Sequence, residues 1–234
     1  MGKSKDLATL KDSGLSIDGT LTTTSTGTNL TSNSYNVVKI QTDKDDNGSN
    51  DDAILQFTTG SSNTVKGELR YDESESMFEI GHGDNQGHIR IDGSGRVTTP
   101  NQPSFYAYTS TDYTATGNLT GGGNWAEKWD VGNNFSAGTF TAPVGGKYYF
   151  EVMWDANSIQ STIDIQVNTT AVVRYEPTGR TDSTWETHFY SAILNLATND
   201  SVRLYGNMHS QSSANPYHMG GSGQWGHFAG FLIG

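Results

Sequence analysis

The chain has 234 residues, no cysteine and a formal net charge of -11, from 14 basic and 25 acidic side chains. Because phosphate contact needs clustered Lys and Arg, and no such cluster occurs, we expect no nucleic-acid partner. The lack of cysteine excludes disulfides and thiolate metal sites, and no window approaches the roughly 18 apolar residues of a membrane span, so we expect no membrane insertion.

The first region, residues 1–30, is almost purely polar and β-branched and has little to bury. This composition is typical of a disordered terminus, or of an arm that becomes ordered on contact with another chain. We expect this segment to attach the protein to a partner.

The second region, residues 31–100, contains short runs in which apolar and polar residues alternate, separated by Gly, Asn, Asp or Ser. Such runs predict short β-strands. The candidate strands are residues 36–42, 53–59, 66–72, 77–81, 88–92 and 95–99. Large apolar residues are too few here for a thick core in one chain, so the region is interpreted as a β-rich shaft that needs partners.

An acidic stretch within this region resembles half of a calcium loop. Asp43, Asp45 and Asn47 alternate, as oxygen ligands do around one Ca²⁺ ion. The twelfth position of such a loop is Ile54 in place of the usual Glu. The preferred interpretation is a solvated acidic hairpin, with calcium as the alternative, and no other cofactor is expected.

The third region, residues 101–234, holds all five tryptophans and nine of the eleven tyrosines. Its candidate strands are residues 104–108, 138–142, 147–155, 161–167, 171–177, 186–196, 200–206 and 227–234. Eight or more strands joined by turns, without a convincing helix, indicate an all-β sandwich. Within it, the Pro- and Gly-containing residues 143–146 predict a turn, and Phe140, Tyr148 and Phe150 are expected to face the interior.

Residues 135–150 resemble the signature of the complement globular-head and tumour-necrosis-factor-like jelly rolls. In that family a G-x-F-x-x-P-x-x-G strand and turn precedes x-Y-x-F. The matching residues are Gly138, Phe140, Pro143, Gly146, Tyr148 and Phe150. Residues 103–108, 194–206 and 228–234 match further family motifs in the family's order. The resemblance implies a ten-stranded jelly-roll knob at residues 101–234 that assembles as a homotrimer through aromatic faces.

The junction between the second and third regions is similar to bacteriophage fibre and appendage proteins, in which a G-x-V-x-x-P-x-x-P-x-F segment joins a shaft to a knob. Gly95, Val97, Pro100, Pro103 and Phe105 fill these places. This resemblance implies a virion protein that binds other virion proteins through its N-terminus and a host-surface glycan or protein through its knob. The alternatives are a capsid decoration or cement protein and a polysaccharide-cleaving tailspike.

The longest knob connection, residues 207–226, is the candidate recognition loop. Tyr217, His218 and Trp225 offer ring faces and a titratable donor to a receptor, whereas Trp225 can instead fill the end of the sandwich. Threefold symmetry would bring copies of His209, His218 or His227 together around a metal ion, but no paired His spacing supports this. No nucleophile–base motif occurs, and the acidic pairs are those expected by chance among 25 carboxylates, so no catalytic residues are predicted.

Overall fold

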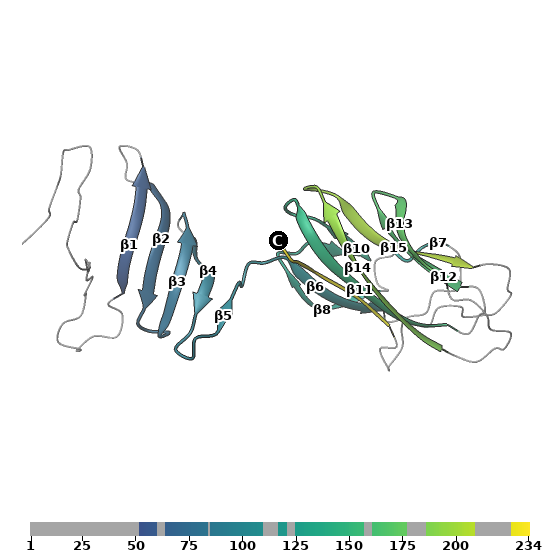
Figure 1. Cartoon of the computed structure of the whole chain (residues 1–234), viewed down its shortest axis with the longest axis horizontal. Helices are drawn as coiled ribbons and strands as arrows, with labels where there is room; N and C mark the ends of the chain where they lie inside the picture. Colours follow the sequence, from purple (N-terminus) through teal and green to yellow (C-terminus); the bar gives the residue numbers. More distant parts are fainter. Residues whose placement is uncertain are drawn as a thin grey trace, which may run out of the picture.

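The computed structural model describes residues 52–59, 64–83, 85–109, 117–120, 125–156, 161–176, 186–208 and 226–234. Every regular element in these ranges is a β-strand, which confirms the predicted all-β class. The strands form a five-stranded sheet and a two-sheet sandwich (Figure 1). In chain order they are β1 Ala53–Thr59, β2 Thr64–Asp72, β3 Met77–His82, β4 Asn85–Ile91, β5 Val97–Thr98, β6 Ser104–Thr109, β7 Gly117–Asn118, β8 Trp125–Val131, β9 Phe135–Ser136, β10 Thr139–Thr141, β11 Gly146–Ala156, β12 Ser161–Val167, β13 Thr170–Tyr175, β14 Glu186–Leu196, β15 Ser201–Met208 and β16 His227–Leu232.

The N-terminal part of the described chain is a single antiparallel sheet, here called the meander, in which β1 to β5 are neighbours in chain order. Its strands contact chiefly one another. The turn between β2 and β3 is fixed by Asp72, whose Oδ1 accepts hydrogen bonds from the Ser74 hydroxyl at 2.6 Å and the Glu75 N–H at 3.1 Å. These bonds, the one from Ser74 foremost, lower the pKa of the Asp72 carboxyl. The meander is thus a one-layer sheet with locally stabilised turns.

Residues 99–103 link β5 to β6 and are hydrogen-bonded to both parts of the molecule. Asn101 Nδ2 lies 3.2 Å from His88 Nδ1 in β4. On the other side, the Leu232 N–H donates to the Pro103 carbonyl at 3.0 Å, and the Gln102 side-chain amide donates to the Leu232 carbonyl. The linker therefore lies against the last strand of the sandwich, beside the C-terminus (Figure 1).

The sandwich contains two antiparallel sheets. One has the strand order β14-β11-β16-β6-β8 and is called the aromatic sheet, after the outward face described below. The other, called the polar sheet, has the order β13-β12-β15-β10-β9, with β7 also paired to β15. Neighbours such as β6 and β16 are far apart in sequence, which is typical of a jelly roll rather than of a simple meander.

The core between these sheets is rich in aromatic rings. Phe105 is 1% exposed and stacks on Phe135 at a centroid distance of 4.6 Å, while Phe228 meets its ring edge-on at 5.0 Å. Gly230 allows this crowding, because a Cβ at that position would lie 2.6 Å from a ring carbon of Phe150. The buried core residues are Phe105, Ala107, Leu119, Phe135, Phe140, Ala142, Tyr148, Phe150, Val152, Trp154, Ile163, Ile165, Leu196, Val202, Leu204 and Phe228.

The turn that the sequence placed at residues 143–146 separates β10 from β11. The Tyr148 hydroxyl donates to the Val144 carbonyl at 2.9 Å, so this buried side chain also holds the turn. Gly138 precedes β10 with a φ of 83°, and a Cβ there would lie 2.6 Å from the Leu119 carbonyl, which the Trp125 indole already binds. Family-signature positions therefore have identifiable packing roles in this chain.

The strands predicted within the described residues are all present, with small differences at their ends. Strand β8 was not predicted, because its charged residues hide the alternation, and neither were the two-residue strands β7 and β9. Residues 1–51, with the predicted attachment segment and the strand at 36–42, lie outside the described residues. The described part of the chain contains no helix that is long and apolar enough to cross a membrane.

Candidate functional site

The outward faces of the two sandwich sheets differ in chemistry. On the polar sheet, β12 directs Asp164 and Gln166 outward. Asp164 accepts two hydrogen bonds from the Arg174 guanidinium, at 2.7 and 2.8 Å, and Gln166 accepts one from Arg203 at 3.1 Å. The hydrogen bonds to Asp164, and secondarily its negative charge, raise the pKa of Arg174. Asp164 and Gln166 therefore have hydrogen-bond partners within the polar sheet.

Aromatic and aliphatic side chains dominate the outward face of the aromatic sheet. The strand register defines three rows across it: Ile193–Tyr149–Phe231–Ser104–Val131, Ser191–Glu151–Ala229–Tyr106–Trp129 and Phe189–Met153–His227–Tyr108–Ala126. Four of these side chains are about half exposed or more: Trp129 at 52%, Phe231 at 47%, Phe189 at 55% and Ile193 at 63%. An exposed apolar patch of this kind marks an interaction surface.

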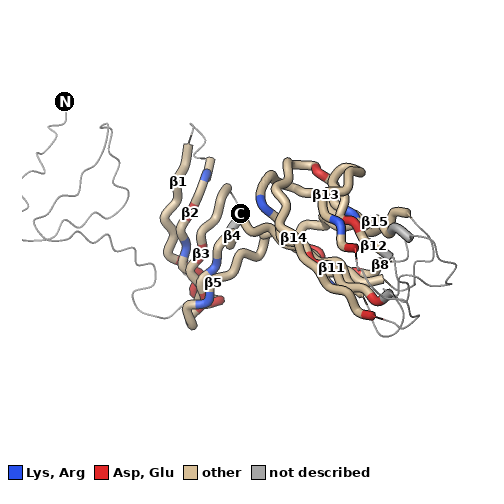
Figure 2. Tube along the Cα trace, turned by 45° about the vertical axis from the view of Figure 1, so that its right-hand side comes forward, with Lys and Arg blue, Asp and Glu red and all other residues tan. Residues whose placement is uncertain are grey.

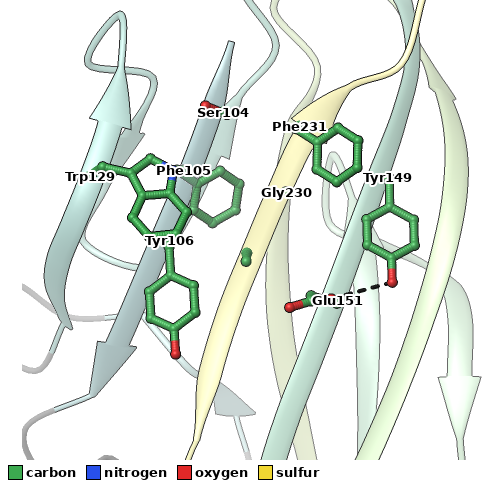
Figure 3. Close-up of a pocket in the computed structure, with 9 residues that line it drawn as sticks. Ser104, Phe105, Tyr106, Trp129, Tyr149, Glu151, Gly230 and Phe231 are labelled. Carbon is green, nitrogen blue, oxygen red and sulfur yellow. Dashed lines mark hydrogen bonds between the residues drawn. The ribbon is translucent and has the colours of Figure 1, made fainter. Parts of the chain in front are cut away.

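A groove of about 300 Å³ lies at the centre of this face. One wall is formed by Tyr106 and Trp129, whose rings stack at 5.0 Å with an interplanar angle of 29°. The other is formed by Tyr149 and Phe231, with ring centroids 5.2 Å apart (Figure 3). Ala229, between the two walls, leaves the groove open because its side chain is small.

The Glu151 carboxylate lines the groove and binds two neighbouring side chains. The Tyr149 hydroxyl donates to Glu151 Oε2 at 3.3 Å, and His227 Nε2 lies 3.0 Å from Glu151 Oε1. The His227 ring also stacks on Tyr106 at 4.9 Å. Burial, and secondarily the negative charge of Glu151, raises the pKa of Tyr106, so this phenol stays neutral well into the alkaline range.

A β-bulge turns Trp129 towards the groove. Trp125 and Trp129 are four residues apart on β8, and in a regular strand an even spacing places both on one face. The pairing of β6 with β8 shifts by one residue between Tyr106 and Ala107. As a result Trp125 packs against the core, where it meets Phe135 edge-on at 5.7 Å, while Trp129 faces outward.

The chemistry of this face suits binding rather than turnover. Its rings offer broad apolar contact area, and its one acid–base pair is a tyrosine-bonded Glu with a stacked His. Flat aromatic surface of this kind is enriched at the centre of protein interfaces. We therefore take the aromatic face, meaning the three rows defined above, as the candidate functional site.

The predicted receptor residues Tyr217, His218 and Trp225 lie outside the described residues. So do the calcium candidates Asp43, Asp45 and Asn47. Both assignments remain predictions.

Of the three histidines considered for a symmetric metal site, only His227 is described, and it lies in β16 beside Glu151. Within the described ranges, no group of three or more His, Asp or Glu side chains is arranged to hold a metal ion. The jelly-roll signature residues are described, and they support the core and its turn rather than the aromatic face.

The groove residues Tyr106, Trp129, Tyr149 and Phe231 were not among the predicted site residues. A signal for three of them was present, because residues 104–108, 147–153 and 228–233 carry aromatic or large apolar side chains at both odd and even positions. A strand that is apolar on both faces is covered on both. Trp129 could not be assigned to a face in this way, because the bulge reverses its direction.

Two antiparallel sheets with this strand order define the chain's C-terminal part as a jelly-roll domain. Residues 129–233 match the family model described as C1q domain. Among solved structures, the globular domain of zebrafish complement 1qA protein is 19% identical with a TM-score of 0.45, and the match covers 57% of this chain and 98% of that one. Murine APRIL at pH 5.0 is 7% identical with a TM-score of 0.45, covering 56% and 99%.

A search of curated proteins gave no match. Residues 129–233 of this jelly roll are thus similar to the C1q domain. Domains of this class are typically non-enzymatic binding modules.

Proposed function

We propose that the protein is a homotrimeric virion subunit of a bacteriophage, a fibre or appendage that serves assembly and host-surface adhesion. The observation that carries the trimer is the aromatic face. Its half-exposed Trp129, Phe189, Ile193 and Phe231 would gain several kcal/mol from burial at ~25 cal/mol per Å². The C1q/TNF-like resemblance, which implies trimers built through aromatic faces, supports the same arrangement.

A matched pair of substitutions tests the trimer. Phe231 on the aromatic face and Val172 on β13 of the polar sheet are each 47% exposed in one chain. An Asp at either position is therefore equally tolerable in a monomer. In the trimer, Phe231→Asp buries a charge at the interface and should yield monomers, whereas Val172→Asp should remain trimeric.

The measurement is the molar mass of the full chain by light scattering at micromolar concentration. A single-chain mass for the unmodified protein would refute the trimer. Equal masses for the two variants would show that the aromatic face is not the contact.

The phage context rests on the resemblance of residues 95–105 to fibre junctions, and host recognition is assigned to the loop at residues 207–226. Replacing Tyr217 and Trp225 by Ala should abolish adsorption to host cells while the melting temperature of the protein stays nearly unchanged. Normal adsorption by this double variant would show that the receptor site lies elsewhere. Loss of folding would show that Trp225 belongs to the core.

Attachment to the virion is assigned to residues 1–30. A chain without them should still form folded trimers but no longer join particles, and normal incorporation would contradict this. Binding to purified capsids that lack tails would favour a decoration protein instead. Release of reducing sugar from host polysaccharide would favour a tailspike.

A further inference from the structure

The register of the meander places two apolar rows on one of its faces. Residues directly opposite each other in neighbouring antiparallel strands lie on the same face. Two rows follow from the pairing: Ala53–Tyr71–Phe78–Ile91–Val97 and Leu55–Leu69–Ile80–Ile89, with Phe57 next to Leu55 on the same side. Neither row contains a charged or hydrogen-bonding side chain apart from the Tyr71 hydroxyl.

These side chains are exposed in a single chain. The exposed fractions are Leu55 44%, Phe57 55%, Tyr71 46%, Phe78 38%, Ile80 37%, Ile89 37% and Val97 63%. For side chains of this size, such fractions leave on the order of 600 Å² of apolar surface in one patch, at the upper end for a soluble monomer. One partner in a stable protein interface contributes about 800 Å², so the patch has nearly the area of half an interface.

The opposite face of the meander is charged, and its groups have partners within the sheet. Arg70 pairs with Asp52 and, at 3.0 Å, with Asp72. Arg90 pairs with Glu79 at 3.0 Å, and Glu79 is only 3% exposed because both arginine-bearing strands flank it. Figure 2 shows acidic and basic positions close together on the meander. This charged face can therefore remain exposed to solvent.

The linker indicates what covers the apolar face. It spans only residues 99–103, at most ~17 Å when extended, and it is hydrogen-bonded to β4 and to β16. Each meander is thereby held close to the aromatic sheet of its own chain. If that sheet forms the trimer contact, three meanders are confined next to one another at an effective concentration in the millimolar range, and each carries the same uncharged patch.

We propose that the apolar face of the meander packs against the same face of two further copies of this chain, forming a three-sheet prism with the charged faces outward. This inference rests on the proposed trimer. The prism adds a second contact between the chains, on the N-terminal side of the linker. In it, the meanders of the other two copies form the second layer that each meander lacks. The prism explains why the charged face pairs internally while the apolar face has no partner among the described residues of one chain.

Cross-linking tests the prism, because the chain has no native cysteine. Ile80→Cys places one thiol at the centre of the apolar face, and Gln56→Cys places one on the charged face. With a short bis-maleimide and the full-length protein, Ile80→Cys should give covalently linked chains and Gln56→Cys should give essentially none. Cover by residues 1–51 of the same chain, or by another protein, predicts no link from Ile80→Cys and would overturn the proposal.

A charge substitution gives an independent test. Leu55 and Gln56 are adjacent and both exposed in a single chain, but they lie on opposite faces. Leu55→Lys should raise hydrogen-exchange rates of β1–β5 amides at least about tenfold, whereas Gln56→Lys should leave them unchanged. Equal exchange in the two variants would overturn the prism.

The mass of the unmodified protein separates the two proposals. A single-chain mass would contradict both the proposed trimer and the prism. A trimer in which Ile80→Cys does not cross-link, or in which Leu55→Lys exchanges like Gln56→Lys, removes the prism alone.

Discussion

The meander and the sandwich are built from strands with the same alternating pattern, yet they bury opposite kinds of side chain. In the sandwich, Phe105 and Phe150 are at most 1% exposed and the ion pair of Asp164 lies on an outer face. In the meander, Phe78 is 38% exposed while Glu79 beside it is 3% exposed. Alternation therefore determines which residues share a face, whereas the presence of a second layer decides whether that face is buried. The sandwich supplies both layers from one chain, and the meander does not.

The largest expected effect compares two phenylalanines. Phe105→Ala removes a ring that stacks on its core neighbours and should cost about 3–5 kcal/mol of unfolding free energy. In an isolated chain, Phe78→Ala should reduce the unfolding free energy far less. If three meanders pack together, the loss should approach that of Phe105→Ala. All five tryptophans lie at or after residue 125, so tryptophan fluorescence in denaturant reports the sandwich.

Hydrogen exchange of β1–β5 supplies the matching measurement for the meander. A small effect of Phe105→Ala would contradict the assigned core. An unchanged meander in Phe78→Ala would indicate that no second layer covers it.

Two glycines provide the next comparison. A Cβ on Gly230 would lie 2.6 Å from a Phe150 ring carbon and 3.0 Å from one of Phe105, whereas a Cβ on Gly67 would meet only the Gly81 carbonyl at 3.5 Å and Phe57 at 4.0 Å. Gly230→Ala should therefore destabilise the sandwich by roughly 1–3 kcal/mol, because neither ring can move in a packed core. Gly67→Ala should be nearly neutral. Denaturant midpoints with unchanged m-values would measure both, and equal effects would refute the difference in packing.

Much of this contrast could be predicted from the sequence. The alternating runs located most strands, and the Pro–Gly turn at residues 143–146 placed Phe140 and Tyr148 on one side. The outward position of Trp129 could not be predicted, because it depends on a bulge that no local pattern encodes. The scarcity of large apolar residues did predict that residues 31–100 have no thick core of their own, but alternation alone could not show that Phe78 is among the side chains left exposed.

Lowering the pH should have a smaller effect than these substitutions, and the effect should occur in both parts of the molecule. Asp200 accepts hydrogen bonds from Asn168 Nδ2 at 2.7 Å and from the Ala197 N–H at 2.8 Å, and these lower the pKa of its carboxyl. A lowered folded-state pKa stabilises the fold above the unfolded value of 3.8, and this contribution is lost as pH falls through the folded value. The stability gap between the unmodified protein and Asp200→Asn should therefore shrink between about pH 5 and pH 2.

Asp72, whose pKa is lowered by Ser74 and its neighbours, should give the same trend in the meander. Unfolding of Asp200→Asn is followed by tryptophan fluorescence, and that of Asp72→Asn by hydrogen exchange. A gap that stays constant with pH would show that the carboxylate form is not the stabilising one.

The smallest expected effect lies in two turns. Thr169 closes the two-residue hairpin between β12 and β13 with a φ of 77°, and Ser76 ends the β2–β3 turn with a φ of 52°. Positive φ strains both residues, but more so the β-branched Thr. Glycine removes the strain at the cost of a more flexible unfolded chain, so Thr169→Gly should stabilise the sandwich by roughly 0.5–1 kcal/mol. Ser76→Gly should change the meander by less, since its strain is smaller and the entropy cost is the same. Thermal melting measures the effect of Thr169→Gly, and hydrogen exchange of β2–β3 amides measures that of Ser76→Gly. A destabilised Thr169→Gly would show that the threonine side chain makes a contact that outweighs its backbone strain.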